Sequence, residues 1–82
     1  MTREKVYKLI DGERNHQDRL WQEKAKRDSG GVGNYIVVMQ TFLNRARDAY
    51  SDNEENGRAM EGIRCVAALA VWCMENHETP PR

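Results

Sequence analysis

The stretch that decides the fold is EGIRCVAALAVWCM, residues 61–74. After Arg64 it runs for ten residues without a charge, in a chain of which 32% is charged. Its apolar residues recur at the three- and four-residue steps of a helix and occupy nearly the whole circumference. A surface helix in a small protein needs only one apolar stripe. This helix is therefore predicted to be covered on several sides.

Two breaks divide the rest of the chain: SGGVGN at residues 29–34 and SDNEENG at residues 51–57. The segments around them show helical periodicity, and none shows the two-residue alternation of a strand. The chain is therefore predicted to be all-α, a single helical domain over residues 1–82 with a short flexible tail at 78–82. The predicted helices span about residues 3–27, 34–51 and 55–77.

Helix boundaries follow from residues with special backbone preferences. Asn34 is the expected N-cap of the second helix, and either Asn53 or Asn56 that of the third. Gly12 lies in the middle of the first helix, where glycine costs about 1 kcal/mol relative to alanine, which leaves a bend or a break open there. Pro80 ends the third helix, because proline cannot continue it.

Three helices provide only two neighbours for the 61–74 helix, which is fewer than its apolar circumference requires. A second copy of the chain would supply more cover and would complete a helical bundle. We therefore predict a homo-oligomer. The alternative is a monomer with Trp72 and one cysteine half exposed. The predicted oligomer-packing residues are Val66, Ala67, Leu69, Ala70, Trp72 and Cys73.

Bulk properties narrow the classes of partner. The 13 basic and 13 acidic residues balance, so nucleic acid is not an expected partner. No apolar run approaches the roughly 20 residues that span a bilayer, so no membrane role is expected. Cys65 and Cys73 would lie about 12 Å apart on one helix, too far for a disulfide. Free thiols favour a cytoplasmic location.

The run GERNHQDRLW, residues 12–21, is the most distinctive polar segment. Glu13, Arg14, Gln17, Asp18 and Trp21 share one side of a helix. Such a side could bind a nucleotide, because the indole stacks on a base and the guanidinium binds phosphate. The competing interpretation is ordinary pairing of Arg14 with Asp18 and a Trp21 that anchors the core.

Two further arginines interrupt apolar segments. Arg45 and Arg64 either extend to solvent or line a shared cleft that holds an anion. The sequence contains no zinc ligand set, because His16 and His77 are isolated and neither cysteine has a partner two to four residues away, and no metal or cofactor is expected. The glycine-rich stretch at residues 29–34 lacks the lysine of a P-loop. A phosphate-binding site there is therefore the minor alternative to a simple connection.

GERNHQDRLW and IRCVAALAVWCMENH together resemble a group of small phage proteins related to the MazG-like, all-α nucleoside triphosphate pyrophosphohydrolases. The likeness lies in an ER-x-x-QD-x-x-W pattern and an Ala/Val-rich segment near the end. It covers most of the chain loosely. The residues that match are Glu13, Arg14, Gln17, Asp18, Trp21 and the stretch 66–71.

The active enzymes of that group hold magnesium with paired glutamates on the second helix and acidic residues on the third. Here Gln40 stands near the first pair, and Gly62 and Cys65 stand near the second group. Glu61 is one residue out of register and would face about 100° away. The resemblance thus implies a member that has kept the bundle and lost the metal site, with no catalytic residues.

Three functions are compatible with these features. The first is a non-catalytic, phage-type helical oligomer that binds a nucleotide-like molecule between helices or subunits and could sequester a defence signal. Its expected ligand-binding residues are Arg14, Gln17, Asp18, Trp21, Arg45 and Arg64. The second is a protein–protein interaction module that acts on a host protein. The third is an active MazG-like pyrophosphohydrolase with an unconventional metal site.

Overall fold

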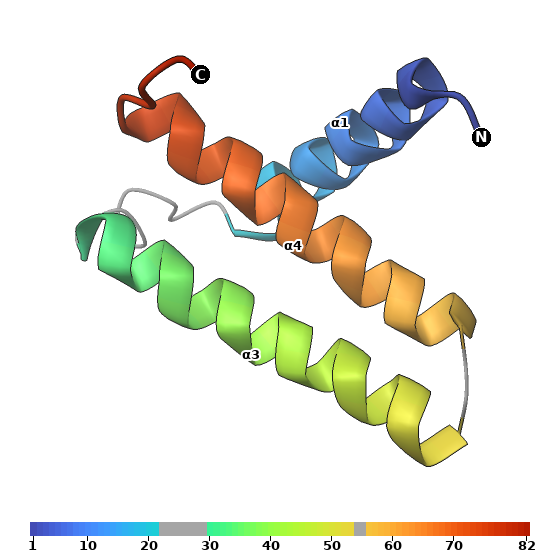
Figure 1. Cartoon of the computed structure of the whole chain (residues 1–82). Helices are drawn as coiled ribbons and strands as arrows, with labels where there is room; N and C mark the ends of the chain where they lie inside the picture. The colour runs from blue at the N-terminus through green and yellow to red at the C-terminus, as the bar shows by residue number, and fades with distance from the viewer. Residues whose placement is uncertain (22–29, 54–55) are drawn as a thin grey trace.

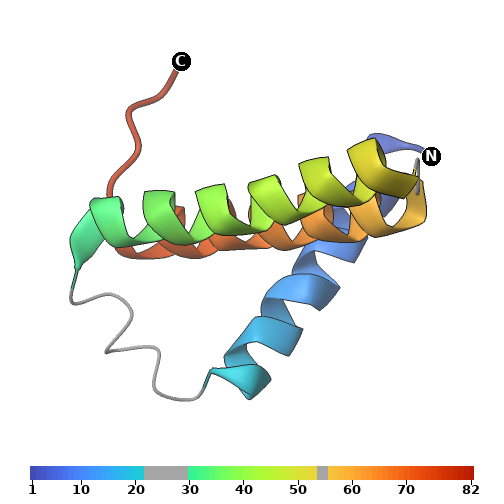
Figure 2. The same ribbon diagram turned by 90° about the horizontal axis from the view of Figure 1, so that it is seen from below.

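The computed structural model describes residues 1–21, 30–53 and 56–82. Over these residues the chain forms three α-helices and no strand, which confirms the all-α fold class. The helices are α1 (Arg3–Leu20), α3 (Gly31–Asn53) and α4 (Asn56–Asn76). Figure 1 shows α3 and α4 side by side, while Figure 2 shows α1 crossing this pair at a steep angle.

Helix α1 begins with a polar cap and ends earlier than its sequence suggests. The Thr2 hydroxyl accepts a hydrogen bond from the Lys5 amide at 3.2 Å, and the helix continues through Gly12 without a break. The prediction of helix to residue 27 is wrong at Trp21, whose ψ of 71° is not helical. Helix propensity contributes only tenths of a kcal/mol per residue, so the packing of the indole against other rings outweighs it. Residues 22–27 lie outside the described residues.

The boundaries of α3 and α4 differ from the predicted ones by up to three residues. Helix α3 already begins at Gly31, so Asn34 lies inside the first turn and is not its N-cap. Gly31 has a φ of +66°, which favours glycine. Asn56 is already helical in α4, so it is not the predicted cap; the alternative cap, Asn53, is the last residue of α3, and residues 54–55, on which that prediction depends, lie outside the described residues. The end of α4 before Pro80 is confirmed.

The core lies where the three helices meet. Tyr35 of α3 and Leu69 and Trp72 of α4 are fully or almost fully buried. Partly buried side chains surround them from all three segments, namely Trp21, Val38, Met39, Phe42, Cys65 and Cys73. Helix α4 is therefore the central element, with α1 on one side and α3 on another.

Candidate functional site

The polar face of α1 packs against α4, where its charges pair with one another. Arg14 is only 7% exposed. Its Nε donates to Glu75 at 2.6 Å and its Nη1 donates to Asp18 at 2.6 Å. The guanidinium also lies 4.2 Å from the centroid of the Trp72 ring, a cation–π contact. The interpretation of Arg14 and Asp18 as an i, i+4 pair is confirmed.

Trp21 lies at the edge of the core. Its ring stacks on Trp72 with centroids 6.0 Å apart, and it meets Phe42 in a tilted contact at 6.5 Å. The ring remains partly exposed, so one edge can still contact solvent. The ring contacts of Trp21 within the chain are therefore those of the predicted core anchor.

Gln17 is buried completely between α1 and α4. Its Nε2 donates to the backbone carbonyl of Cys65 at 3.1 Å and approaches the Cys65 sulfur at 3.6 Å. Its Oε1 is buried and has no hydrogen-bond partner among the described residues. A buried acceptor without a partner costs about 1–3 kcal/mol, so the side chain contributes less stability than its burial suggests.

Arg64 reaches across to α1 within the same chain. Its Nε donates to Glu13 at 2.8 Å. The pair lies beside a shallow hollow of about 300 Å³ that Lys8, Leu9 and His16 also line. The carboxylate therefore already partners this guanidinium, and a ligand anion would have to compete with it.

Arg45 is exposed on α3. Its guanidinium lies 5.0 Å from the centroid of the Phe42 ring. Both residues line a groove of about 260 Å³ to which Arg58 and Glu61 contribute from α4. Of the residues predicted to bind a ligand, Arg14, Gln17, Asp18 and Trp21 meet at the α1–α4 seam, whereas Arg45 and Arg64 lie in two other hollows.

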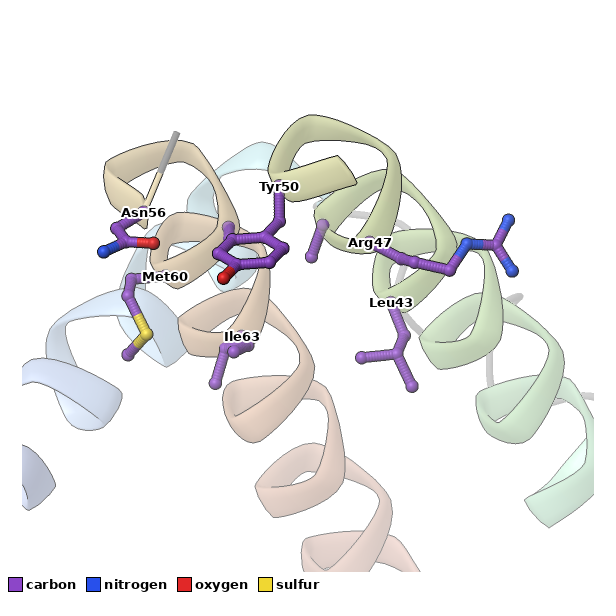
Figure 3. Close-up of a pocket in the computed structure, with 8 residues that line it drawn as sticks. Leu43, Arg47, Tyr50, Asn56, Met60 and Ile63 are labelled. Carbon is purple, nitrogen blue, oxygen red and sulfur yellow. The ribbon is translucent and has the colours of Figure 1, made fainter. Parts of the chain in front are cut away.

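A larger, apolar hollow of about 560 Å³ opens between the C-terminal half of α3 and the N-terminal half of α4. Figure 3 shows Leu43 and Tyr50 of α3 on one side and Met60 and Ile63 of α4 on the other, with Arg47 at the edge. These four apolar side chains are all exposed. Sequence reasoning missed Leu43 and Met60, although the recurrence of apolar residues at positions 36, 43 and 50 was a signal for Leu43.

Apolar residues continue beyond this hollow along the same side of α3 and of α4. On α4, residues Met60, Ile63, Ala67, Ala70 and Met74 follow one another at steps of three and four. On α3, exposed Val32 and Ile36 continue the row of Leu43 and Tyr50. We call these nine residues the apolar face. It consists of Val32, Ile36, Leu43, Tyr50, Met60, Ile63, Ala67, Ala70 and Met74.

The residues predicted to pack an oligomer divide into two groups. Leu69 and Trp72 are 0% and 2% exposed and pack inside the chain. Val66, Ala67, Ala70 and Cys73 are partly exposed, and two of these, Ala67 and Ala70, belong to the apolar face.

Within the described ranges, no three or more His, Cys, Asp or Glu residues gather where they could hold a metal ion. In that same part of the chain, none of the helices combines the length and the apolar character that crossing a membrane requires. Comparison with protein-family models, with curated proteins and with solved structures gives no match to this chain. The likeness to MazG-like proteins thus depends on the quoted motifs and stays a prediction.

Proposed function

We propose that this protein is a non-catalytic interaction module that binds another polypeptide through the apolar face. The observation that carries the proposal is the hollow between α3 and α4, whose large apolar lining side chains, Leu43, Tyr50, Met60 and Ile63, are exposed. Contiguous apolar surface of this kind marks sites of protein–protein contact, because solvent exposure of so many apolar atoms is costly. Helix surfaces commonly bind partner helices in such grooves.

The state of the charged residues supports a binding role for the apolar face over one for the α1 seam. Arg14 is paired with two carboxylates and lies over an indole ring, and Arg64 is paired with Glu13. An anionic ligand at either arginine would have to displace a carboxylate that is already in place. No such exchange is needed at the apolar face.

Site-specific photo-cross-linking in cells that express the protein tests this proposal. A photoreactive phenylalanine analogue at Leu43 should give one adduct of discrete mass. The matched control is Val37, which is 66% exposed on the polar side of α3, where the same group should give none. A second substitution, Ile63→Asp, should abolish the adduct formed from position 43. Adducts of equal yield from positions 37 and 43, or none from position 43, would contradict the proposal.

The groove beside Arg45 supports a second candidate function, the binding of a nucleotide-like anion by a phage-type oligomer. An arginine next to an aromatic ring in a groove of about 260 Å³ offers charge and a stacking surface. Calorimetric titration with linear and cyclic nucleotides should then show binding that Arg45→Ala weakens at least tenfold, while Arg47→Ala does not. Absence of heat with every nucleotide would remove this candidate.

A further inference from the structure

We infer that the polypeptide bound by the apolar face is a second copy of this chain, and that the two copies form a four-helix bundle from their α3 and α4 helices. The inference rests on the proposed function and names its partner. It begins with the surroundings of α4. Helix α1 contacts α4 at Arg64, Cys65 and Glu75, through the side chains of Glu13, Gln17 and Arg14.

Helix α3 covers a second side of α4. Ala46 approaches Gly62 there, and Tyr35 contacts Trp72 and accepts a hydrogen bond from Asn76. The side of α4 that remains carries Met60, Ile63, Ala67, Ala70 and Met74. It has no charged residue, and its three large side chains are 45–58% exposed. A helix with apolar residues on all sides thus has protein on only two of them.

The size of the apolar face suits a dimer interface. Seven of its side chains are large and each is about half exposed. Together they present on the order of several hundred Å² of apolar surface, since a fully exposed aliphatic side chain offers about 60–120 Å² and an aromatic one more. Patches on monomers reach about 300–600 Å², and a stable interface buries about 800 Å² per partner. An interface of that size would also include the two alanines and the rim around Arg47, which lines the hollow.

The order of residues on α4 makes the face complementary to itself. An antiparallel pairing of two α4 helices with Ala67 at the two-fold axis places Met60 of one copy against Met74 of the other. Ile63 of one copy then lies beside Ala70 of the other, so a large side chain meets a small one. Alanine at the axis lets the two helices approach closely. Because the chain has a net charge of zero, two copies meet without net repulsion.

The first experiment measures the mass of the purified full chain in reducing buffer by light scattering, from about 1 to 200 µM. The expected result is twice the monomer mass of 9.5 kDa. Ile36→Asp and Ile63→Asp should weaken the dimer at least about a hundredfold, because each buries an unpaired charge in the interface. The matched control, Val37→Asp, should leave the dimer intact, since Val37 lies about 100° around the helix from Ile36. Circular dichroism checks that each variant is folded.

A cross-link tests the geometry directly and needs no destabilising substitution. With Cys65 and Cys73 replaced by alanine, Ala67→Cys should form a disulfide-linked dimer on mild oxidation, because residues at the axis come within disulfide reach. Val37→Cys in the same background should form no disulfide-linked dimer.

Three results would overturn the inference: a monomer at every concentration, a dimer that survives Ile63→Asp, or oxidation of Ala67→Cys no faster than that of Val37→Cys. A monomer that still gives a discrete photo-adduct from position 43 would retain the interaction module and assign it a different protein partner.

Discussion

Gly62 of α4 packs closely against Ala46 of α3, and its substitution tests the packing of the pair. A Cβ at this position would lie 2.8 Å from the Cβ of Ala46 and 3.5 Å from its Cα. Both atoms belong to or directly join the backbone, so neither can rotate away. Gly62→Ala therefore requires the two helices to separate by several tenths of an ångström along a contact that also supports Leu69 and Trp72.

Two opposing effects set the magnitude. Alanine is favoured over glycine inside a helix by about 1 kcal/mol. Overpacking a well-packed contact costs about 1–3 kcal/mol. We expect Gly62→Ala to leave the free energy of unfolding unchanged or to lower it by up to about 2 kcal/mol. Gly12→Ala is the matched control, because a Cβ at Gly12 in α1 would meet nothing within 4 Å. That variant should gain about 0.5–1 kcal/mol.

Urea denaturation at one fixed protein concentration measures both variants, since self-association would make stability depend on concentration. Thermal denaturation gives a second readout, because in a chain of this size 1 kcal/mol corresponds to a shift of about 4–8 °C in Tm. A third variant removes the clash from the other side. Adding Ala46→Gly to Gly62→Ala should cost less than the sum of the two single substitutions, because the overlapping Cβ is gone.

The reasoning fails if Gly62→Ala stabilises the protein as much as Gly12→Ala does. It also fails if the effects of Ala46→Gly and Gly62→Ala simply add. Either result would mean that α3 and α4 are farther apart than 2.8 Å between the two Cβ positions implies.

Three further substitutions address single contacts, each measured by urea denaturation. Arg14→Ala should cost about 1–2 kcal/mol, below the 3–5 kcal/mol of a fully buried pair, because the Glu75 side chain is 51% exposed and can rehydrate; no loss would show that the pair is not formed. Gln17→Leu should change stability by less than about 1 kcal/mol, since the lost hydrogen bond to the Cys65 carbonyl is offset by removal of a buried acceptor that has no partner, and a loss above 2 kcal/mol would indicate that Oε1 is hydrogen-bonded. Tyr35→Phe should cost about 0.5–1.5 kcal/mol through the lost contact with Asn76. An unchanged midpoint would argue against that bond.

The candidate site was only partly predictable. The i, i+4 relation of Arg14 and Asp18 is local and could be predicted from spacing. Arg14 is buried by two partners, Glu75 and Trp72, which lie about 60 residues away in the sequence. The pairing of Glu13 with Arg64 likewise joins residues 51 positions apart. No periodicity carries information about such pairs, because they depend on where α1 crosses α4.

The apolar face shows the same division. The spacing of residues 36, 43 and 50 was visible, but Tyr35, Phe42 and Ala46 supplied a competing stripe on the same helix. Sequence alone could not decide which stripe contacts α4. The structure buries Tyr35 and Ala46 and leaves the other stripe exposed.

The sequence by itself determined the all-α class, the three helices found over the described residues, the end of α4 before Pro80 and the apolar circumference of α4. These features depend on local backbone preferences and on the 3.6-residue period, which a single segment already contains. Only the tertiary structure decided that α1 ends at Leu20, that Trp21 lies against Trp72, and which side of α4 stays uncovered. Those features arise from packing between distant segments, whose energies exceed the tenths of a kcal/mol per residue that separate one local preference from another.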